Sequence, residues 1–334
     1  TDIPSLFQAQ LNERLGLSAP SFAPGQGAYT SAQSVAVTGD PLATGFRYTT
    51  NGTEPSATTG TVYSTGISVN SNTTLKAVAY SGAFPASPVS TAHYLVGPDA
   101  VSVNDAASFV NRVLATSQSG VFAVEFDAVP TGNLDNGVIG LSFGSATAYS
   151  SMAVAVRFNP SGSIDARNGG AFAAANAINY SQNERYTFRL LVNVPAKTYS
   201  AYVTPFGGAT QLIGANYAFR TEQSAVASLN TRSVRAQTGT LLVGPSQLID
   251  SQVATPSISP RGAAIRYPTD GSSPTANSGT VYTSPFTVST TTTVRAIATS
   301  PGLFDSNTAT AVFTINDTSY QVTQLDTFHN YPLG

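Results

Sequence analysis

The sequence contains one motif twice, and this duplication constrains the fold more than any other feature. Phe46-Arg-Tyr-Thr-Thr-Asn-Gly-Thr-Glu-Pro returns as Ile265-Arg-Tyr-Pro-Thr-Asp-Gly-Ser-Ser-Pro, at an offset of 265 − 46 = 219 residues. The same offset relates Lys76-Ala-Val-Ala to Arg295-Ala-Ile-Ala, so the repeated unit is larger than one loop. We therefore predict two related domains with a separate domain between them.

Length and charge narrow the class of protein. The 334 residues are enough for two or three domains with cores of their own. Basic and acidic residues number 15 and 17, so the chain lacks the basic surface that nucleic-acid binding requires. It also has no polybasic segment for a membrane surface, and no apolar run reaches the ~18–20 residues of a membrane span.

The cellular location is also an expectation from composition. Cysteine is absent, so packing rather than disulfides stabilises the fold, and thiolate metal sites are excluded. Residue 1 is Thr rather than Met, and Lys occurs only at positions 76 and 197. We expect a mature extracellular or cell-surface protein from which a signal peptide has been removed.

Residues 1–18 carry the strongest helix pattern in the chain. Phe7, Leu11 and Leu15 recur at the spacing of one helix face. A single short stripe is not stable alone, so we expect this helix to dock on a neighbouring domain or on another chain.

Short strand-like segments separated by Asn-Gly, Thr-Gly and Ser-Gly turns fill residues 19–96, which predicts an immunoglobulin-like sandwich. Tyr48-Thr-Thr-Asn-Gly-Thr-Glu-Pro, Gly60-Thr-Val-Tyr and Thr73-Thr-Leu-Lys-Ala-Val-Ala-Tyr resemble the fibronectin-type-III-associated repeat, also called the chitobiase/hexosaminidase C-terminal-like domain. The resemblance implies an accessory β-sandwich of secreted bacterial proteins, often beside carbohydrate-active modules and without catalytic residues.

Longer alternating strands with Gly-rich corners fill residues 97–247 and favour a two-sheet jelly roll. Val156-Arg-Phe-Asn-Pro-Ser-Gly-Ser-Ile-Asp, Phe188-Arg-Leu-Leu-Val-Asn-Val-Pro and Tyr217-Ala-Phe-Arg-Thr-Glu-Gln are similar to a concanavalin A/laminin-G-like jelly roll found in bacterial polysaccharide-degrading proteins. That family usually has a Trp after a Leu-Asn step, whereas Leu229-Asn230 is followed here by Thr-Arg-Ser and the chain has no Trp.

The second copy of the repeat, residues 248–316, is shorter than the first. In the first copy 46 − 22 = 24 positions separate Phe22 from Phe46, but 265 − 258 = 7 separate Ile258 from Ile265. About one strand, the counterpart of residues 29–37, is missing, which predicts a truncated immunoglobulin-like sandwich with an open edge. The tail at 317–334 is a candidate to fill it, through apolar contacts of Tyr320, Val322, Leu325 and Phe328.

No set of residues has the spacing of a catalytic centre. His93 and His329 are far apart in the sequence and lack metal-site spacing, and no G-x-S-x-G nucleophile motif occurs. Glu125 and Asp127 share a strand face and could in principle serve as paired carboxylates, but their strand alternates like a solvated one. Asp127 and Asp135 are weak candidates for calcium ligands, and we expect no other cofactor.

The densest polar cluster in the sequence is Arg157, Asp165, Arg167 and Asn168. It could bind hydroxyl or carboxylate groups of a glycan, with Tyr180 and Tyr186 as stacking rings. The alternative, which we favour, is an Arg–carboxylate pair that holds the corner between two strands.

The sequence therefore predicts an all-β protein that is not an enzyme: an immunoglobulin-like sandwich, a jelly roll and a truncated sandwich, with a short N-terminal helix. Two functions remain. The first is a structural subunit that assembles with copies of itself outside the cell by strand or tail exchange. The second is a carbohydrate-binding accessory protein of a polysaccharide-degrading system.

Overall fold

The computed structural model describes residues 16–104, 108–132, 136–249, 264–268, 270–283, 286, 291–300 and 305–313. These residues form β-strands and two short 3-10 helices, η1 (Tyr149–Ser151) and η2 (Thr221–Gln223), which confirms the all-β class. Within them, no helix has the length and hydrophobicity needed to span a bilayer. Of the predicted N-terminal helical segment, residues 1–18, only residues 16–18 are described, and they are not helical; the rest lies outside the described residues.

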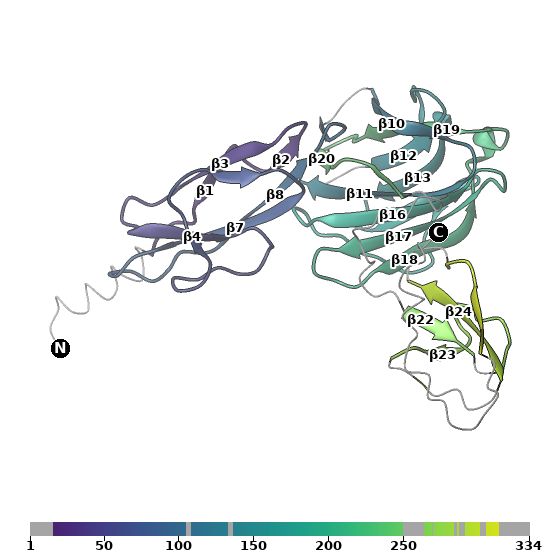
Figure 1. Ribbon diagram of the computed structural model, residues 1–334. Helices are drawn as coiled ribbons and strands as arrows, with labels where there is room; N and C mark the ends of the chain where they lie inside the picture. Colours follow the sequence, from purple (N-terminus) through teal and green to yellow (C-terminus); the bar gives the residue numbers. More distant parts are fainter. Residues whose placement is uncertain are drawn as a thin grey trace.

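The first repeat is the predicted immunoglobulin-like sandwich of two sheets (Figure 1). One sheet has the order β1 (Ser21–Ala23), β3 (Gln33–Thr38), β6 (Ile67–Val69). The other has the order β2 (Gly27–Tyr29), β8 (Ser90–Val96), β7 (Thr73–Tyr80), β4 (Gly45–Thr49), β5 (Thr61–Val62). Alternate residues of both sheets, such as Val35 and Val37 on β3 and Leu75 and Ala77 on β7, form one buried core.

The central domain is a two-sheet jelly roll. Its six-stranded sheet has the order β10 (Val110–Gln118), β19 (Leu229–Arg235), β12 (Gly137–Ser142), β13 (Met152–Phe158), β14 (Ile164–Asn168), β15 (Ala171–Ala173). The opposing sheet has the order β18 (Gln211–Ala218), β17 (Thr198–Pro205), β16 (Tyr186–Asn193), β11 (Val121–Thr131), β20 (Thr240–Val243), β9 (Val101–Asn104), and β21 (Gln247–Ile249) also pairs with β11. Between the sheets, Phe188 stacks on Phe126 and meets Phe158 edge to face, so this core is continuous.

The second repeat reproduces half of the first at the offset seen in the sequence. Its sheet has the order β23 (Thr280–Val281), β22 (Ala264–Tyr267), β24 (Thr292–Thr299), β25 (Ala309–Phe313), which matches β5, β4, β7 and β8. Local contacts recur as well: Arg47 Nη1 donates to Gly60 O at 2.9 Å, and Arg266 Nη1 to Gly279 O at 3.1 Å. The counterpart of β3 falls where residues are not described, so the missing strand stays a prediction.

The first repeat and the jelly roll are joined by a buried junction. Leu95 of the repeat packs with Val129 and Leu242 of the jelly roll. Polar contacts surround this apolar cluster: Asn72 Nδ2 donates to Asp127 Oδ2 at 2.8 Å, and Gln26 Nε2 donates to Asn183 Oδ1 at 2.9 Å. Because apolar burial and directed hydrogen bonds act at one junction, we expect these two domains to move as one unit.

A buried arginine holds the connection between the two domains. Arg232 of β19 is fully buried, and its guanidinium donates to the carbonyl oxygens of Asp99 and Gly244. The Asp99 carboxylate lies 3.5 Å from the same guanidinium, and it also accepts the backbone N–H of Ser246 at 2.9 Å. Burial, partly offset by the charge of Asp99, lowers the pKa of Arg232 to about 10.

Candidate functional site

The outer face of the six-stranded sheet carries arginine because its strands alternate between core and surface. On β13, Val154, Val156 and Phe158 point into the core of the jelly roll. Arg157 stands between two of them and therefore points to the opposite face, away from the second sheet.

The strand register lines up further polar side chains with Arg157. Val138 of β12 is paired with Arg157 on one side and with Arg235 of β19 on the other. Arg157 is itself paired with Asp165 of β14. Directly paired residues in antiparallel strands share a face, so Arg235, Val138, Arg157 and Asp165 form one row across four strands.

A second pair lies beside this row, towards the edge of the sheet. Arg167 of β14 is paired with Phe172 of β15, two residues along from Asp165 and so on the same face. The Phe172 ring lies beneath both neighbouring guanidinium groups, with its centroid 3.9 Å from Arg157 Cζ and 5.5 Å from Arg167 Cζ. Such cation–π contacts hold the planar groups over the ring.

Two more aromatic rings flank Arg235. Its Cζ lies 5.4 Å from the ring of Phe109 and 5.2 Å from the ring of Tyr149, which pack edge to face against each other. Asn111 of β10 fixes the loop that carries Tyr149, because its side chain both donates to Ala146 O and accepts from Ala146 N–H. We call the set Phe109, Tyr149, Arg157, Arg167, Phe172 and Arg235 the arginine face.

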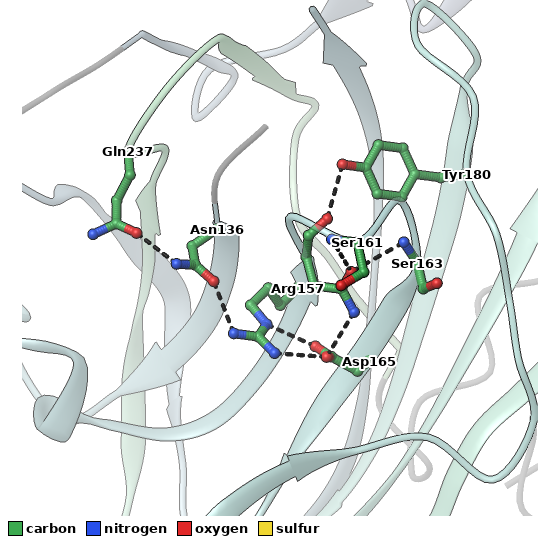
Figure 2. Close-up of polar contacts among 8 residues, drawn as sticks. Asn136, Arg157, Ser161, Ser163, Asp165, Tyr180 and Gln237 are labelled. Carbon is green, nitrogen blue, oxygen red and sulfur yellow. Dashed lines mark hydrogen bonds and ion pairs between the residues drawn. The ribbon is translucent and has the colours of Figure 1, made fainter. Parts of the chain in front are cut away.

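Arg157 and Asp165 form the strand corner that the sequence suggested. Figure 2 shows the two side chains joined by two parallel hydrogen bonds, from Nε to Oδ1 at 2.8 Å and from Nη2 to Oδ2 at 2.7 Å. The Asp165 carboxylate is 8% exposed and also accepts from Asn159 Nδ2 at 2.9 Å. Asn159 Oδ1 in turn accepts the backbone N–H groups of Ser161 and Ser163, so the pair fixes the β13–β14 turn.

Two amide side chains extend the hydrogen-bond network of Arg157 and Asp165 towards β19. Arg157 Nη1 donates to Asn136 Oδ1 at 2.7 Å, and Asn136 Nδ2 donates to Gln237 Oε1 at 2.6 Å (Figure 2). Gln237 is exposed, so the chain ends in solvent. The guanidinium of Arg157 is thus oriented from both sides.

In contrast to Arg157, two arginines in or near this face have donor atoms without partners among the described residues, as do Arg185, Arg232, Arg266 and Arg295 elsewhere. The Nε of Arg235 is buried and has no hydrogen-bond partner among the described residues. Arg220, which is 5% exposed, has two such atoms, Nε and Nη2. Its backbone N–H donates to Ala153 O at the start of β13, and burial together with the charge of Arg167 lowers its pKa.

Tyr149 has the same kind of unpaired polar atom. Its Oη is buried without a partner in the described part of the chain. Burial raises the pKa of Tyr149, while the charges of Arg235 and Arg157 act in the opposite direction. Buried polar groups are normally hydrogen-bonded, so Tyr149, Arg220 and Arg235 are exceptions among the described residues.

The other predicted glycan contacts are placed differently. Asn168 lies on the opposite side of β14 from Arg167, where its Oδ1 accepts Ala218 N–H at 3.0 Å. Tyr180 is half-buried, with its ring against Phe158 and its hydroxyl donating to Asn159 O at 3.1 Å. Tyr186 is 4% exposed inside the core, so its proposed role as a stacking ring is wrong: its alternation places it facing the other sheet.

The calcium candidates do not come together in the described residues. Asp127 lies at the domain junction, where its oxygens accept from Asn72 Nδ2 and from Thr187 Oγ1 and where Arg185 Nε lies 4.0 Å away. Asp135 lies outside the described residues. No group of three or more His, Cys, Asp or Glu side chains with metal-site geometry occurs in the described ranges. Calcium binding stays a prediction.

Glu125 and Asp127, which the sequence suggested as paired carboxylates, are also bound by other side chains of the protein. Glu125 accepts from Arg189 Nε at 2.8 Å, and Asp127 accepts from Asn72 and Thr187. Both carboxylates therefore have donors of this chain bound to them.

The residues predicted to take part in self-assembly lie outside the described residues. They are Phe7, Leu11, Leu15, Tyr320, Val322, Leu325 and Phe328.

Sequence reasoning did not find Phe109, Tyr149, Arg220 or Arg235. The register of β12 and β19 brings Arg235 near Arg157, although the two are far apart in the chain. Tyr149 is close to Arg157 in sequence, but only its ring contacts with Arg235 and Phe109 place it at this face. One local signal existed: in Ser233-Val-Arg-Ala, Arg235 alternates with the buried Val234 and so had to point away from the core.

Two segments of the chain match known family models. Residues 37–94 match the "Fn3 associated" family, and residues 246–311 match the "Chitobiase/beta-hexosaminidase C-terminal domain" family. These matches confirm the resemblance of the two repeats that their residues suggested.

Whole-protein relatives overlap only in part. A gellan lyase from a Bacillus species is 32% identical over 106 residues, which are 31% of this chain and 4% of that protein. The chain thus spans a small fraction of this relative. Among solved structures, lectin I-B4 from Griffonia simplicifolia is 15% identical with a TM-score of 0.29, covering 61% of this chain and 91% of that chain.

A second solved structure is the catalytic domain of a glycoside hydrolase family 131 protein from Coprinopsis cinerea. It is 12% identical with a TM-score of 0.31, covering 46% of this chain and 70% of that chain. At these scores the two likenesses carry no argument about function, and the fold assignment rests on the strand order described above.

Proposed function

We propose that this chain is a non-catalytic, polysaccharide-binding portion of an extracellular carbohydrate-active protein. The observation that carries the proposal is the arginine face, which combines aromatic rings with hydrogen-bond donors on an outer sheet surface. The half-buried rings of Tyr149 and Phe172 can stack on the apolar faces of sugars, whereas Phe109 is 8% exposed and packs under Arg235. Guanidinium groups can donate to sugar oxygens.

The relatives support the same class of function. The matching segment of the gellan lyase is a small part of a long protein, as expected for an accessory region. The second repeat matches a family described as the "Chitobiase/beta-hexosaminidase C-terminal domain", a name that refers to carbohydrate-active proteins. Both observations favour the carbohydrate-associated alternative over self-assembly.

The absence of catalysis is part of the proposal. Glycosidases need two carboxylates that face the substrate about 5–10 Å apart. Glu125 and Asp165 lie on different sheets, and each is bound by an arginine of this chain. We therefore expect no release of reducing ends from any polysaccharide that the chain binds.

Affinity electrophoresis of the whole chain through gels with and without soluble polysaccharides tests the proposal. We expect retarded migration in at least one polysaccharide and unchanged substrate after long incubation. Unchanged migration with every polymer would contradict binding, and new reducing ends would contradict the non-catalytic role.

A further inference from the structure

The arginine face offers donors rather than acceptors. Arginine has five N–H donors and no acceptor, and the one carboxylate in this row, Asp165, is already bound by Arg157 and Asn159. Arg235 and Arg220 still have buried donor atoms without partners among the described residues. A complementary ligand must therefore supply acceptors.

The charge of the arginine face also favours a ligand that supplies acceptors. Arg157, Arg167 and Arg235 lie in the face, against the one carboxylate of Asp165, so the positive charges there exceed the negative ones although the chain has a net charge of −2. The whole chain has only 15 basic residues, which are thirteen arginines and the lysines Lys76 and Lys197. The concentration of arginines in this face favours an anionic ligand.

We propose that the arginine face binds an acidic polysaccharide whose sugars carry carboxylate groups. This inference rests on the proposed function and names the substrate class of the same site. A carboxylate is an acceptor-only group that matches the planar guanidinium in a two-bond geometry, whereas a neutral hydroxyl also needs an acceptor for its own proton.

The aromatic rings favour a sugar over a simple anion. Phe109, Tyr149 and Phe172 hold the guanidinium groups of Arg235, Arg157 and Arg167 in place. Such fixed groups lose less conformational entropy when a ligand binds. The Phe172 side chain is only half-buried, so it keeps apolar surface that a sugar face can contact.

The spacing of the charges indicates a polymer. Arg235 lies on β19 and Arg157 on β13, with β12 between them, so their strands are roughly 10 Å apart. Arg167 lies one strand further on. One carboxylate cannot reach both ends of this row, whereas a chain of acidic sugars presents charges at intervals along it.

A pair of polymers with one backbone tests the role of the carboxylate. The intact chain is titrated calorimetrically with polygalacturonate and with its methyl ester, in which the same carboxylates are neutral. We expect binding of polygalacturonate that weakens with added salt, and no detectable binding of the ester. Dextran sulfate, with neutral dextran as its control, distinguishes recognition of carboxylates from a general attraction to polyanions.

Arg167→Gln and Arg235→Gln locate the site, because neither side chain has an ion-pair partner among the described residues. We expect each to weaken binding of polygalacturonate about tenfold or more, the effect of losing a charged hydrogen bond. Arg112→Gln is the matched control. Arg112 lies on β10 of the same sheet but on the opposite face from Arg235. Its neighbour Asn111 is the residue that is paired with Ser233 and shares the face of Arg235. The control variant removes the same charge and should leave binding within about twofold.

Arg235→Lys checks that a loss reflects the ligand rather than the fold, since it keeps the charge and loses only the planar fork. An affinity between those of the native chain and Arg235→Gln, at unchanged melting temperature, supports the assignment. Equal losses in Arg112→Gln and Arg235→Gln would overturn the site.

Binding of the methyl ester as strong as that of polygalacturonate, or of dextran sulfate alone, would overturn the substrate class while the proposed polysaccharide-binding function stands. If no polysaccharide of any charge binds, the proposed function itself fails.

Discussion

His93 and Asn183 are joined across the domain junction, since His93 Nε2 donates to the carbonyl oxygen of Asn183 at 2.9 Å. Because Nε2 carries the proton, Nδ1 of the neutral ring accepts from Thr74 Oγ1 at 3.0 Å. The ring is 2% exposed and meets Phe206 of the jelly roll edge to face. The sequence showed only that His93 lacks metal-site spacing, whereas its contacts with the neighbouring domain make it part of the junction.

The buried His93 should make the stability of the two-domain unit depend on pH. Burial, and to a smaller extent the charge of Arg185, lowers the pKa of His93 to about 4. Weaker effects of either sign come from Asn183, Asp127 and Lys76. In the unfolded chain the group titrates near 6.5. Between these values the unfolded state binds more protons, so the free energy of unfolding falls as the pH is lowered from 6.5 to 4, by up to about 3 kcal/mol.

Denaturant unfolding at steps across this range measures the effect, and His93→Gln separates it from the carboxylates that also titrate near pH 4. The variant should show a flatter pH dependence between pH 6.5 and 4. Identical slopes for the variant and the native chain would contradict a buried neutral His93.

Gly52→Ala should destabilise the junction. Gly52 has φ +79°, and an added Cβ would lie 2.3 Å from Cε1 of Phe206, the ring that also contacts His93 and Arg185. We expect a loss of about 1–3 kcal/mol in the free energy of unfolding, from backbone strain and displacement of the ring. Gly82→Ala, where a Cβ meets nothing within 4 Å, is the control and should change stability by less than about 1 kcal/mol.

Asp165→Asn should destabilise the jelly roll by about 2–3 kcal/mol, because Arg157 then loses its charged partner in a largely buried place. The matched surface change is Glu54→Gln, which breaks the pair with Lys76 where the glutamate side chain is 66% exposed. That change should cost less than about 1 kcal/mol. Chemical denaturation of both variants compares the two pairs, and equal small losses would argue against a structural role for Asp165.

Arg232→Met should loosen the connection between the first repeat and the jelly roll. The variant leaves the carbonyl oxygens of Asp99 and Gly244 without their donor, at a cost of about 1–3 kcal/mol. Differential scanning calorimetry should then resolve one more transition than in the native chain, because the first repeat and the jelly roll no longer unfold together. Arg112→Met, which replaces the residue paired with Arg232 on β10, should leave the number of transitions unchanged. Separate transitions for the first repeat and the jelly roll in the native chain would contradict a rigid pair of domains.

Local patterns in the sequence predicted most of the long strands. The strands β4, β7, β12, β13 and β16 stand out in the sequence as runs of apolar residues bounded by turn residues, because each of these strands has a face in a core. The short strands β14, β15 and β21 have three to five residues, too few for alternation to identify. The offset between the repeats held in the structure because strand pairing and turn glycines were duplicated together.

The candidate site was predictable only where its residues are close in sequence. Arg157 and Asp165 are eight positions apart on adjacent strands, and their pairing follows from a single turn. Arg235 reaches the same face through β12, a relationship set by long-range register that no local pattern reports. The position of Asp127 at a domain junction also depends on a second domain, so its sequence context could not distinguish it from a metal ligand.

The most direct test of the central claim is nuclear magnetic resonance of the arginine Nε–H groups during titration with an oligogalacturonide. The Nε of Arg167 donates to Gly169 O at 2.9 Å, whereas the Nε of Arg235 has no partner among the described residues. We predict that both Nε–H signals shift and saturate together when the ligand binds the neighbouring Nη groups, while that of Arg189 on the outer face of the other sheet stays unchanged. Shifts confined to Arg189, or an absence of shifts at Arg167 and Arg235 despite binding, would contradict the arginine face as the polysaccharide site.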